Sequence, residues 1–154
     1  FDAFLKVDRL MREEAGLNAP EIFASATDHR FMLLSDLGRE TYLDVLTEEN
    51  AGALMDKATT ALVAWQKISR PGVLPPYSRE VLQREIDLFP EWYVGRHRGV
   101  TWNETQQKWW RMATDAILDN NCREALVFVH RDFMPRNLMV SEPMPGILDF
   151  QDAL

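Results

Sequence analysis

Toward the C-terminal end of the chain, short apolar runs alternate with polar residues at fixed positions. Apolar runs occupy residues 126–129, 138–140 and 147–148, and the last two are separated by a turn that contains two prolines and a glycine. Runs this short, bounded by turn-forming residues, predict strands rather than helices. The segment is therefore predicted to be three short strands, with polar residues exposed where one strand ends and the next begins.

The polar residues of this segment follow a recognisable spacing. The loop reads His130-Arg131-Asp132 and reaches Asn137 after four further residues, and Asp149 follows Asp132 by seventeen residues. This order and spacing match the catalytic loop and the metal-binding strand of the protein-kinase fold. Phosphoryl transfer requires positioned oxygens and neutralised phosphate charge. A carboxylate can orient a hydroxyl and accept its proton, and amide and carboxylate oxygens suit Mg²⁺.

The pattern therefore predicts Asp132 as the catalytic base and Asn137 and Asp149 as magnesium ligands, converging on one triphosphate. His130 is expected to anchor the loop rather than to act as a catalytic acid. For Arg131 two interpretations stay open, a contact with a phosphate or acidic partner and an ordinary solvated surface side chain. The alternative for the whole motif is an exposed turn rich in polar residues.

The first half of the chain predicts one helix, a hairpin and a second helix. Apolar residues recur at helical spacing over residues 4–15, and Gly16 is a suitable stop. The apolar runs 22–26 and 31–34 are separated by turn residues, which indicates a β-hairpin. Residues 50–68 form the longest one-faced helical pattern, and a proline-rich connector ends it.

Two further helices are expected before the strands. Ser78 can cap a helix that reaches about residue 89, and Thr101 with Glu104 fits a capping box for a helix reaching about residue 120. The inner face of the second helix is expected to hold Trp109, Ala113, Ala116 and Ile117. The order of helix, hairpin, helices and short strands is an α+β arrangement rather than a regular βαβ alternation.

Composition removes several classes of function. The 154 residues carry 17 basic and 24 acidic side chains, a net charge of -7, without any Lys/Arg-rich block. This charge distribution argues against a nucleic-acid or anionic membrane surface. The longest apolar stretch, residues 125–129, is too short to span a bilayer. The one cysteine, Cys122, excludes a disulfide within the chain and predicts a reducing compartment, the cytoplasm.

The residues of the catalytic motif resemble those of the aminoglycoside phosphotransferase family, the small-molecule branch of kinase-like folds, and the resemblance covers nearly the whole chain. Residues 31–38 look like the hinge between the lobes of that family. The resemblance implies that backbone groups of Ser35, Asp36 and Leu37 receive the adenine of ATP. The side chain of Asp36 is expected to cap the following turn.

Within the family the likeness is closest to bacterial anomeric kinases of N-acetylmuramate and N-acetylglucosamine. It rests on residues 33–38 with Thr41 and Tyr42, on residues 89–93 and on residues 148–153. It implies a MgATP-dependent kinase that phosphorylates a sugar hydroxyl, the anomeric one.

Other functions remain as alternatives. Within the same chemistry the acceptor would be an aminoglycoside, choline or homoserine, and in another class the chain would be a nucleotide-binding pseudokinase or regulatory module. Gln151 stands where protein kinases have glycine, which disfavours a conventional protein kinase. Asp152 and Trp92 are weaker candidates for acceptor contacts. Asp152 fits equally well as a tie for the strand end, and Trp92 as part of an aromatic helix junction.

The resemblance also implies a truncated protein-kinase-like fold. Residues 1–38 would be the end of the N-terminal lobe with its hinge, and residues 39–154 a mainly helical C-terminal lobe that carries the catalytic hairpin and is incomplete at its end. The phosphate loop and the strand lysine are expected upstream of residue 1, and the acceptor-binding helices beyond residue 154. The segment alone is expected to be a poor enzyme.

Overall fold

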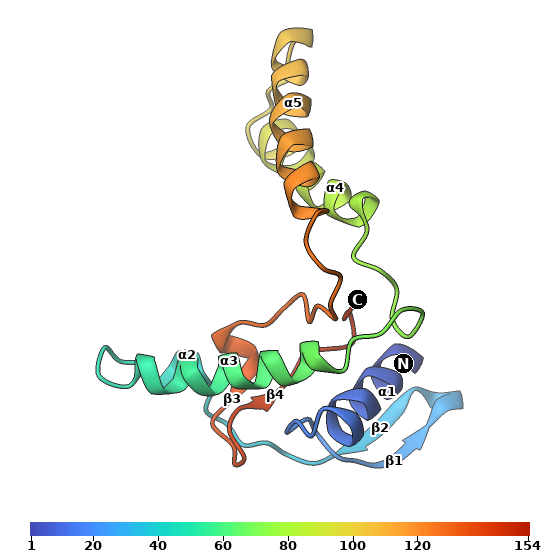
Figure 1. The fold of residues 1–154 in the computed structure, drawn as a ribbon, viewed down its shortest axis with the longest axis vertical. Helices are drawn as coiled ribbons and strands as arrows, with labels where there is room; N and C mark the ends of the chain where they lie inside the picture. Colours follow the sequence, from blue (N-terminus) through green and yellow to red (C-terminus); the bar gives the residue numbers. More distant parts are fainter. The chain divides into compact units, whose positions relative to one another are not determined.

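The computed structural model describes residues 1–154 and groups them into two compact units. The first unit comprises residues 1–74 and 127–154, and the second comprises residues 75–126. Helices dominate and the strands are few and short, which is the α+β arrangement expected from the sequence (Figure 1). The predicted boundary between the lobes, after residue 38, is not the boundary between these two units, and it stays a prediction.

The first unit begins with a helix and a hairpin. Helix α1 (Asp2–Arg9) continues as a π-helical segment (Leu10–Glu14), and Gly16 beyond it has a left-handed φ of 66°, as expected for a helix stop. Strands β1 (Ile22–Ala26) and β2 (Phe31–Leu34) pair antiparallel, with an irregularity in register near the start of β1. The predicted hairpin is therefore confirmed.

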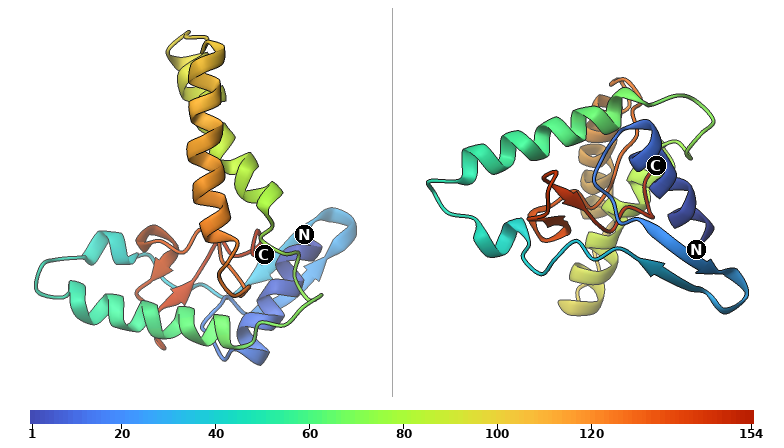
Figure 2. Two further views of the ribbon diagram at one scale, coloured as in Figure 1. Left: turned by 45° about the horizontal axis from the view of Figure 1, so that its top comes forward. Right: turned by 90° about the horizontal axis from the view of Figure 1, so that it is seen from below.

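The rest of the first unit consists of two helices and the C-terminal hairpin. Helix α2 (Tyr42–Val45) is followed by the long helix α3 (Ala51–Lys67), close to the predicted bounds. A 3₁₀ turn, η4 (Pro135–Asn137), leads into strand β3 (Leu138–Met139), which pairs antiparallel with β4 (Gly146–Ile147). The right-hand view of Figure 2 shows this hairpin beside α3.

The predicted strand at residues 126–129 is wrong. This stretch is an extended connector without a strand partner along its length. Only Val129 exchanges backbone hydrogen bonds with another segment, through its N–H and C=O and those of Leu154 at 2.7 and 2.9 Å. The amide of Phe128 instead donates to the hydroxyl of Ser69 at 2.7 Å. A single paired residue satisfies the local backbone but builds no ladder.

One core holds the two ends of the first unit together. The ring of Phe4 in α1 lies 4.7 Å from that of Phe150, and Trp65 in α3 lies 5.2 Å from Phe128. Burial of large apolar side chains contributes about 2 kcal/mol each. The large buried members are Val7, Leu10, Met11, Tyr42, Leu54, Trp65, Leu74, Phe128, Leu138, Ile147 and Phe150. The C-terminal hairpin is therefore held by residues from the start of the chain.

Asn18 fastens the turn of that hairpin. Its side-chain amide donates to the carbonyls of Ser141 and Pro143 at 3.2 and 3.1 Å, and its own carbonyl accepts from the amide of Ile147 at 2.7 Å. Three bonds from one residue fix the position of β4 against the segment after α1.

Gly146 lies where the space is smallest. A Cβ at this position would approach Cδ1 of Leu37 to 3.0 Å, Cβ of Met139 to 3.1 Å and Cβ of Ser141 to 3.3 Å. The Leu37 methyl can turn away, whereas the Cβ atom of Met139 is fixed to the strand backbone that pairs with Gly146. Glycine is therefore required here by close approach rather than by an unusual dihedral angle.

We predict that Gly146→Ala lowers the free energy of unfolding by about 1 to 3 kcal/mol, because the added methyl overpacks the β3–β4 pair. Gly52→Ala is the matched control. Its site in α3 has nothing within 4 Å of an added Cβ. That change should raise the free energy of unfolding by about 0.5 to 1 kcal/mol through helix propensity. Urea denaturation measures both, and equal effects of the two substitutions would contradict the packing argument.

Asp8 is a buried carboxylate on α1. It is 4% exposed, and its Oδ1 atom has no hydrogen-bond partner. Burial raises the pKa of Asp8 from 3.8 to about 6, and the nearby Arg12 guanidinium offsets only part of that rise. The ionised form is therefore unfavourable in the folded chain.

A raised pKa in the folded state makes stability fall as pH rises. Below about pH 4 both states hold the Asp8 proton, between about pH 4 and 6 only the folded state keeps it, and above that range the full penalty applies. Relative to Asp8→Asn, the wild type should lose about 1 to 3 kcal/mol between pH 4 and pH 8. Urea midpoints of both proteins measured across this range give the difference. A constant difference would show that Asp8 ionises normally.

The second unit is a pair of helical arms. Helix α4 (Arg79–Leu88) continues as the π-helical segment η3 (Phe89–His97), and α5 (Glu104–Asn121) packs against α4. Ser78 caps α4 as predicted, accepting from the amide of Val81 at 3.4 Å. Arg79 joins the helices through Asp115 and Asp119, at 2.7 and 2.6 Å. No helix of the chain combines the length and the apolar character needed to cross a bilayer.

Two predictions for α5 are wrong. Its capping box is formed by Asn103 and Gln106, whose side chains bond each other's backbone amides at 2.9 and 3.0 Å, because the helix begins two residues later than Thr101 allows.

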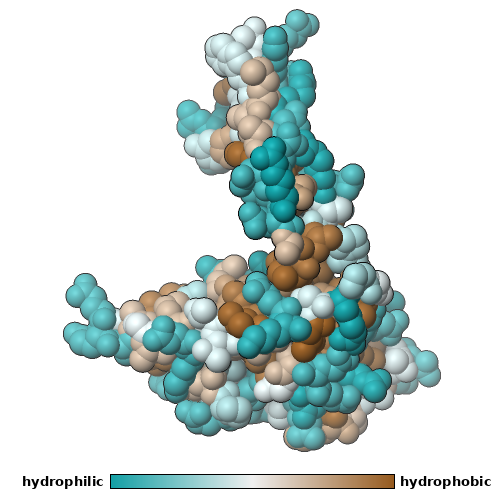
Figure 3. All heavy atoms as spheres, viewed as in Figure 1, coloured by the Kyte–Doolittle hydropathy of each residue, from teal (hydrophilic) through white to brown (hydrophobic).

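The apolar face of α5 that the sequence points to is exposed. Trp109 and Ile117 are 65% and 52% exposed, whereas Thr114 and Leu118 are buried. Tan and brown atoms accordingly reach the surface along α5 in Figure 3. The helix carries two stripes, and the stripe of Trp110, Thr114 and Leu118 is the less exposed one. Trp110 stacks on Phe89 with ring centroids 5.5 Å apart.

Candidate active site

The loop between the extended segment and β3 is closed at both ends. Val129 is paired with Leu154 through two backbone bonds, and the amide of Asn137 donates to the carbonyl of Met134 at 2.8 Å to close the 3₁₀ turn. The amide of Leu148 donates to the carbonyl of Asn137 at 2.9 Å. The end of the loop is therefore bonded to Leu148, the residue between β4 and Asp149.

Asn137 connects the two predicted halves of the site. Its side-chain amide donates to the backbone carbonyl of Asp132 at 2.9 Å and to Oδ2 of Asp149 at 3.4 Å. The structure thus brings together Asn137, Asp149 and the backbone of Asp132, which are twelve and five residues from Asn137 in sequence. Their joint position is what the motif spacing predicts, while their chemical roles stay predictions.

Gln151 orients the Asp149 carboxylate. Its side-chain amide donates to Oδ1 of Asp149 at 2.7 Å, so both carboxylate oxygens of Asp149 face an amide. Asp149 is exposed and has a left-handed φ of 61°. In the sequence, Gln151 serves only to disfavour a protein kinase, and its contact with Asp149 is not predicted. The signal was available, because an amide two residues from a carboxylate is within reach in a tight turn.

His130 is buried beneath the loop. It is 1% exposed and its ring meets that of Phe133 edge-on, with centroids 5.4 Å apart. Burial lowers the pKa of His130, although the carboxylates of Asp132 and Asp149 act in the opposite direction. A neutral, enclosed imidazole fits the expected anchor and not a proton donor.

The donor set suits a hard cation. Asn137 and Asp149 are adjacent, with the amide nitrogen of Asn137 toward the carboxylate. An Asn carbonyl and an Asp carboxylate are oxygen ligands of the kind that Mg²⁺ prefers. The chain contains no group of three or more His, Cys, Asp or Glu side chains that could hold an ion by themselves. An ion at Asn137 and Asp149 would therefore complete its coordination with phosphate oxygens and water, as Mg²⁺ does in nucleotide sites.

The predicted hinge directly follows β2 and is held by hydrogen bonds. The amide of Ser35 donates to the carbonyl of Glu21 at 2.8 Å, and the Ser35 hydroxyl accepts from the Glu21 amide at 2.7 Å. Asp36 caps the following turn as expected, accepting from the amide of Gly38 at 2.8 Å. These bonds fix the backbone at Ser35, Asp36 and Leu37, whose adenine contact stays a prediction.

Leu37 places the predicted hinge beside the C-terminal hairpin. Its Cδ1 atom packs against Gly146 at the start of β4. Asp149 follows three residues later on the same segment. The sequence alone did not connect these two elements, since nothing in either motif signals the contact.

The two weaker candidates are not joined to the hairpin by any bond. Asp152 is exposed at the end of the chain segment that follows Asp149. Trp92 belongs to the second unit, is 51% exposed, and has the Arg96 guanidinium 4.0 Å above its ring. Both remain predictions.

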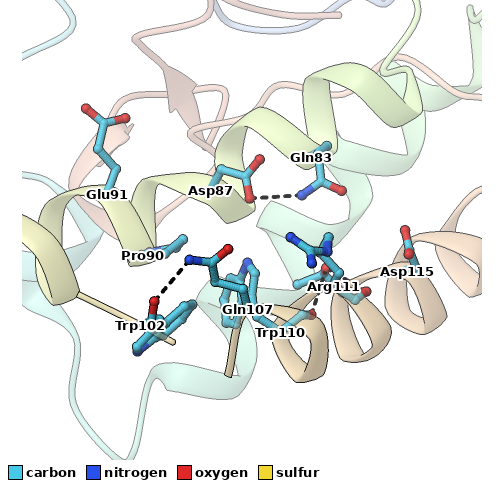
Figure 4. A pocket seen from close by; sticks show the side chains of 10 residues that line it. Gln83, Asp87, Pro90, Glu91, Trp102, Gln107, Trp110, Arg111 and Asp115 are labelled. Atoms are coloured by element: carbon cyan, nitrogen blue, oxygen red, sulfur yellow. Dashed lines mark hydrogen bonds between the residues drawn. The ribbon is translucent and has the colours of Figure 1, made fainter. Parts of the chain in front are cut away.

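The second unit contains a hollow of its own, of about 500 Å³ (Figure 4). Trp102 and Trp110 line it, but Trp92 does not. Its amides bond locally, Gln83 to Asp87 and Gln107 to the carbonyl of Trp102, both at 3.0 Å. No pairing of a nucleophile with a base lies there, so the C-terminal hairpin is the stronger candidate.

Arg131 is held in an unusual backbone conformation. Its φ is 74°, in the left-handed region, and its side chain is exposed. For residues other than Gly, Asn or Asp this conformation costs about 1 kcal/mol or more.

We predict that Arg131→Gly raises the free energy of unfolding by about 0.5 to 1 kcal/mol, because glycine adopts this φ without strain. Arg136→Gly is the comparison, since Arg136 lies in the same loop without a positive φ. That change should lower the free energy of unfolding by a similar amount. Thermal unfolding of both variants measures the difference. A loss of stability in Arg131→Gly would mean that the guanidinium contributes more than the strain costs.

The chain is similar to several known proteins. The profile of the phosphotransferase enzyme family, APH, matches residues 1–154. A protein of Pseudomonas aeruginosa named N-acetylmuramate/N-acetylglucosamine kinase is 50% identical over 151 residues, 98% of this chain and 44% of that protein. A protein of the same name from Neisseria meningitidis is 42% identical over 98% of this chain and 46% of its own length. The chain thus spans less than half the length of these curated relatives.

Solved structures show the same fold. The gentamicin complex of APH(2″)-IIa superposes with a TM-score of 0.66 at 16% identity, over 98% of this chain and 54% of that one. The streptomycin–ATP complex of APH(2″)-IIa gives a TM-score of 0.62 at 18% identity, over 99% and 56%. At such low identity the likeness concerns the fold alone, and it confirms the kinase-like fold expected from the sequence.

Proposed function

The chain belongs to the phosphotransferase enzyme family, and from that premise we propose that it carries the phosphoryl-transfer site of an ATP-dependent sugar kinase. Membership confirms the resemblance found in the sequence. The proposed reaction transfers the γ-phosphoryl group of MgATP to the anomeric hydroxyl of N-acetylmuramate or N-acetylglucosamine. Relatives at 42% to 50% identity carry names with this activity, which supports the choice of acceptor.

The observation that carries the proposal is the position of the Asn137 amide. It lies 2.9 Å from the carbonyl of Asp132 and 3.4 Å from the Asp149 carboxylate. One short side chain therefore sets the distance between the proposed base loop and the proposed metal carboxylate. An ordinary surface turn has no need of such a contact.

Each residue has a defined task in this proposal. Asp132 orients the acceptor hydroxyl and receives its proton while that oxygen bonds to the γ-phosphorus and the bond to the β-phosphate oxygen breaks. Asn137 and Asp149 would hold Mg²⁺, which neutralises phosphate charge when bound. Gln151 fixes the carboxylate of Asp149. The backbone of residues 35–37 would receive the adenine.

Other acceptors are weaker candidates. The aminoglycoside complexes resemble this chain in fold only, so they do not favour an aminoglycoside, and no observation favours choline or homoserine. The adjacent Asn137 and Asp149 disfavour a nucleotide-binding regulatory module without activity. Supply of ATP makes the cytoplasm the proposed compartment, and the single exposed thiol of Cys122 is compatible with it.

The proposal is tested by ATP consumption with N-acetylmuramate, N-acetylglucosamine, kanamycin and choline, using the protein at the length of its curated relatives. We expect turnover with an amino sugar and a loss of about 10²- to 10⁴-fold in kcat for Asp132→Asn, with MgATP binding retained. Asp149→Asn should raise the magnesium concentration needed for half-maximal turnover. Full activity in Asp132→Asn would refute the assignment. Binding of MgATP without turnover on any acceptor would favour the regulatory module.

A further inference from the structure

We propose that Arg131 binds the carboxylate of N-acetylmuramate and thereby sets the preference between the two acceptors. This inference rests on the function proposed above and assigns a specificity role within the same site. The two amino sugars differ in one respect that matters here, because N-acetylmuramate carries a lactic acid ether and N-acetylglucosamine does not. One acceptor is an anion and the other is neutral.

The backbone at Arg131 is the first reason. A left-handed φ of 74° strains an arginine, and glycine would occupy this position without cost. Non-glycine residues in this region concentrate at sites where the side chain has a task. The retained side chain therefore points to a requirement for the guanidinium itself rather than for the fold.

Position is the second reason. His130 is buried at 1% exposure, whereas Arg131 is exposed and Asp132 is partly buried. The left-handed residue turns the chain between an inward side chain and the proposed base. The guanidinium therefore starts one residue from the carboxylate that faces the acceptor hydroxyl, and its long stem can reach a substituent elsewhere on the same sugar.

Charge is the third reason. Residues 127–154 contain four carboxylates, whereas Arg131 and Arg136 are the basic side chains apart from the neutral His130. The acidic members of the segment are Asp132, Glu142, Asp149 and Asp152. An anionic sugar that approaches this segment together with ATP meets like charge. A cation beside the acceptor makes its binding more favourable.

Guanidinium chemistry fits the group to be recognised. Its planar fork binds a carboxylate through two parallel hydrogen bonds, a geometry that the ammonium of lysine does not provide. Two other roles for Arg131 would affect both acceptors alike. A contact with the phosphates of ATP is common to both reactions, and so is any support of Asp132. The ratio of kcat/KM for N-acetylmuramate to that for N-acetylglucosamine therefore separates carboxylate binding from these two other roles.

The experiment measures this ratio in the protein at the length of its curated relatives. The variants are Arg131→Gly, Arg131→Lys and, as the control, Arg136→Ala, which removes the other exposed cation of the same loop. We expect Arg131→Gly to lower the ratio by about 10- to 100-fold. Arg131→Lys should lie between this variant and the wild type, and Arg136→Ala should keep the wild-type ratio. Glycine suits the backbone at position 131, so the variant is expected to fold.

A second substrate isolates the carboxylate. For the methyl ester of N-acetylmuramate, the wild type and Arg131→Gly should show the same kcat/KM relative to N-acetylglucosamine. The inference is overturned if Arg131→Gly leaves the ratio within about twofold of wild type, or lowers both acceptors in proportion. A wild type that turns over neither amino sugar refutes the proposed function itself. A wild type that uses both with no change of ratio in Arg131→Gly refutes only the role of Arg131.

Discussion

The close approach at Gly146 governs the geometry of the candidate site. At this one residue the hinge, through Leu37, meets the β3–β4 pair, and Asn18 bonds the next residue along. Three segments that are distant in sequence, at Asn18, at Leu37 and in the β3–β4 hairpin, converge on a position where an added methyl group would crowd its neighbours. Asp149 follows the end of β4 by two residues, and Asn137 immediately precedes β3. Packing in the core, rather than the loop itself, therefore places the polar residues.

The site and its support carry several locally unfavourable features. Arg131 and Asp149 both have left-handed backbones, His130 is enclosed, and Asp8 is buried without a full set of partners. In natural proteins, residues that disagree with local structural preferences are found mainly at functional sites. Arg131, Asp149 and His130 lie in the loop and strand end that the proposed chemistry uses. Asp8 lies in α1, whose Phe4 packs on Phe150. Burial of the ionised Asp8 carboxylate therefore lowers the stability of the same core.

What the sequence could predict follows from the range of the interactions. The hairpin at residues 22–34, α3 and the joint position of Asn137 and Asp149 depend on local patterns, and these predictions are confirmed. The inner face of α5 was wrong because two apolar stripes compete, and the choice between them depends on which partner surface is available. The strand at residues 126–129 failed because apolar character gives no information on whether a partner strand lies alongside. The contact of Leu37 with Gly146 joins residues far apart in the chain, and a single sequence contains no signal for it.

The hydrogen bonds of Asn18 have a consequence for the order in which the fold is assembled. They reach across 123 and 125 residues to the carbonyls of Ser141 and Pro143. Closing so large a loop costs conformational entropy, which the hydrogen bonds within local helices do not offset. We therefore expect these contacts to form late in folding. On the ribosome the N-terminal helix and hairpin emerge long before their partners. Until residues 138–147 follow, the surface meant for them stays open to water and to other chains. Among residues 1–154, the segment that contains the candidate site is thus expected to take up its final position late.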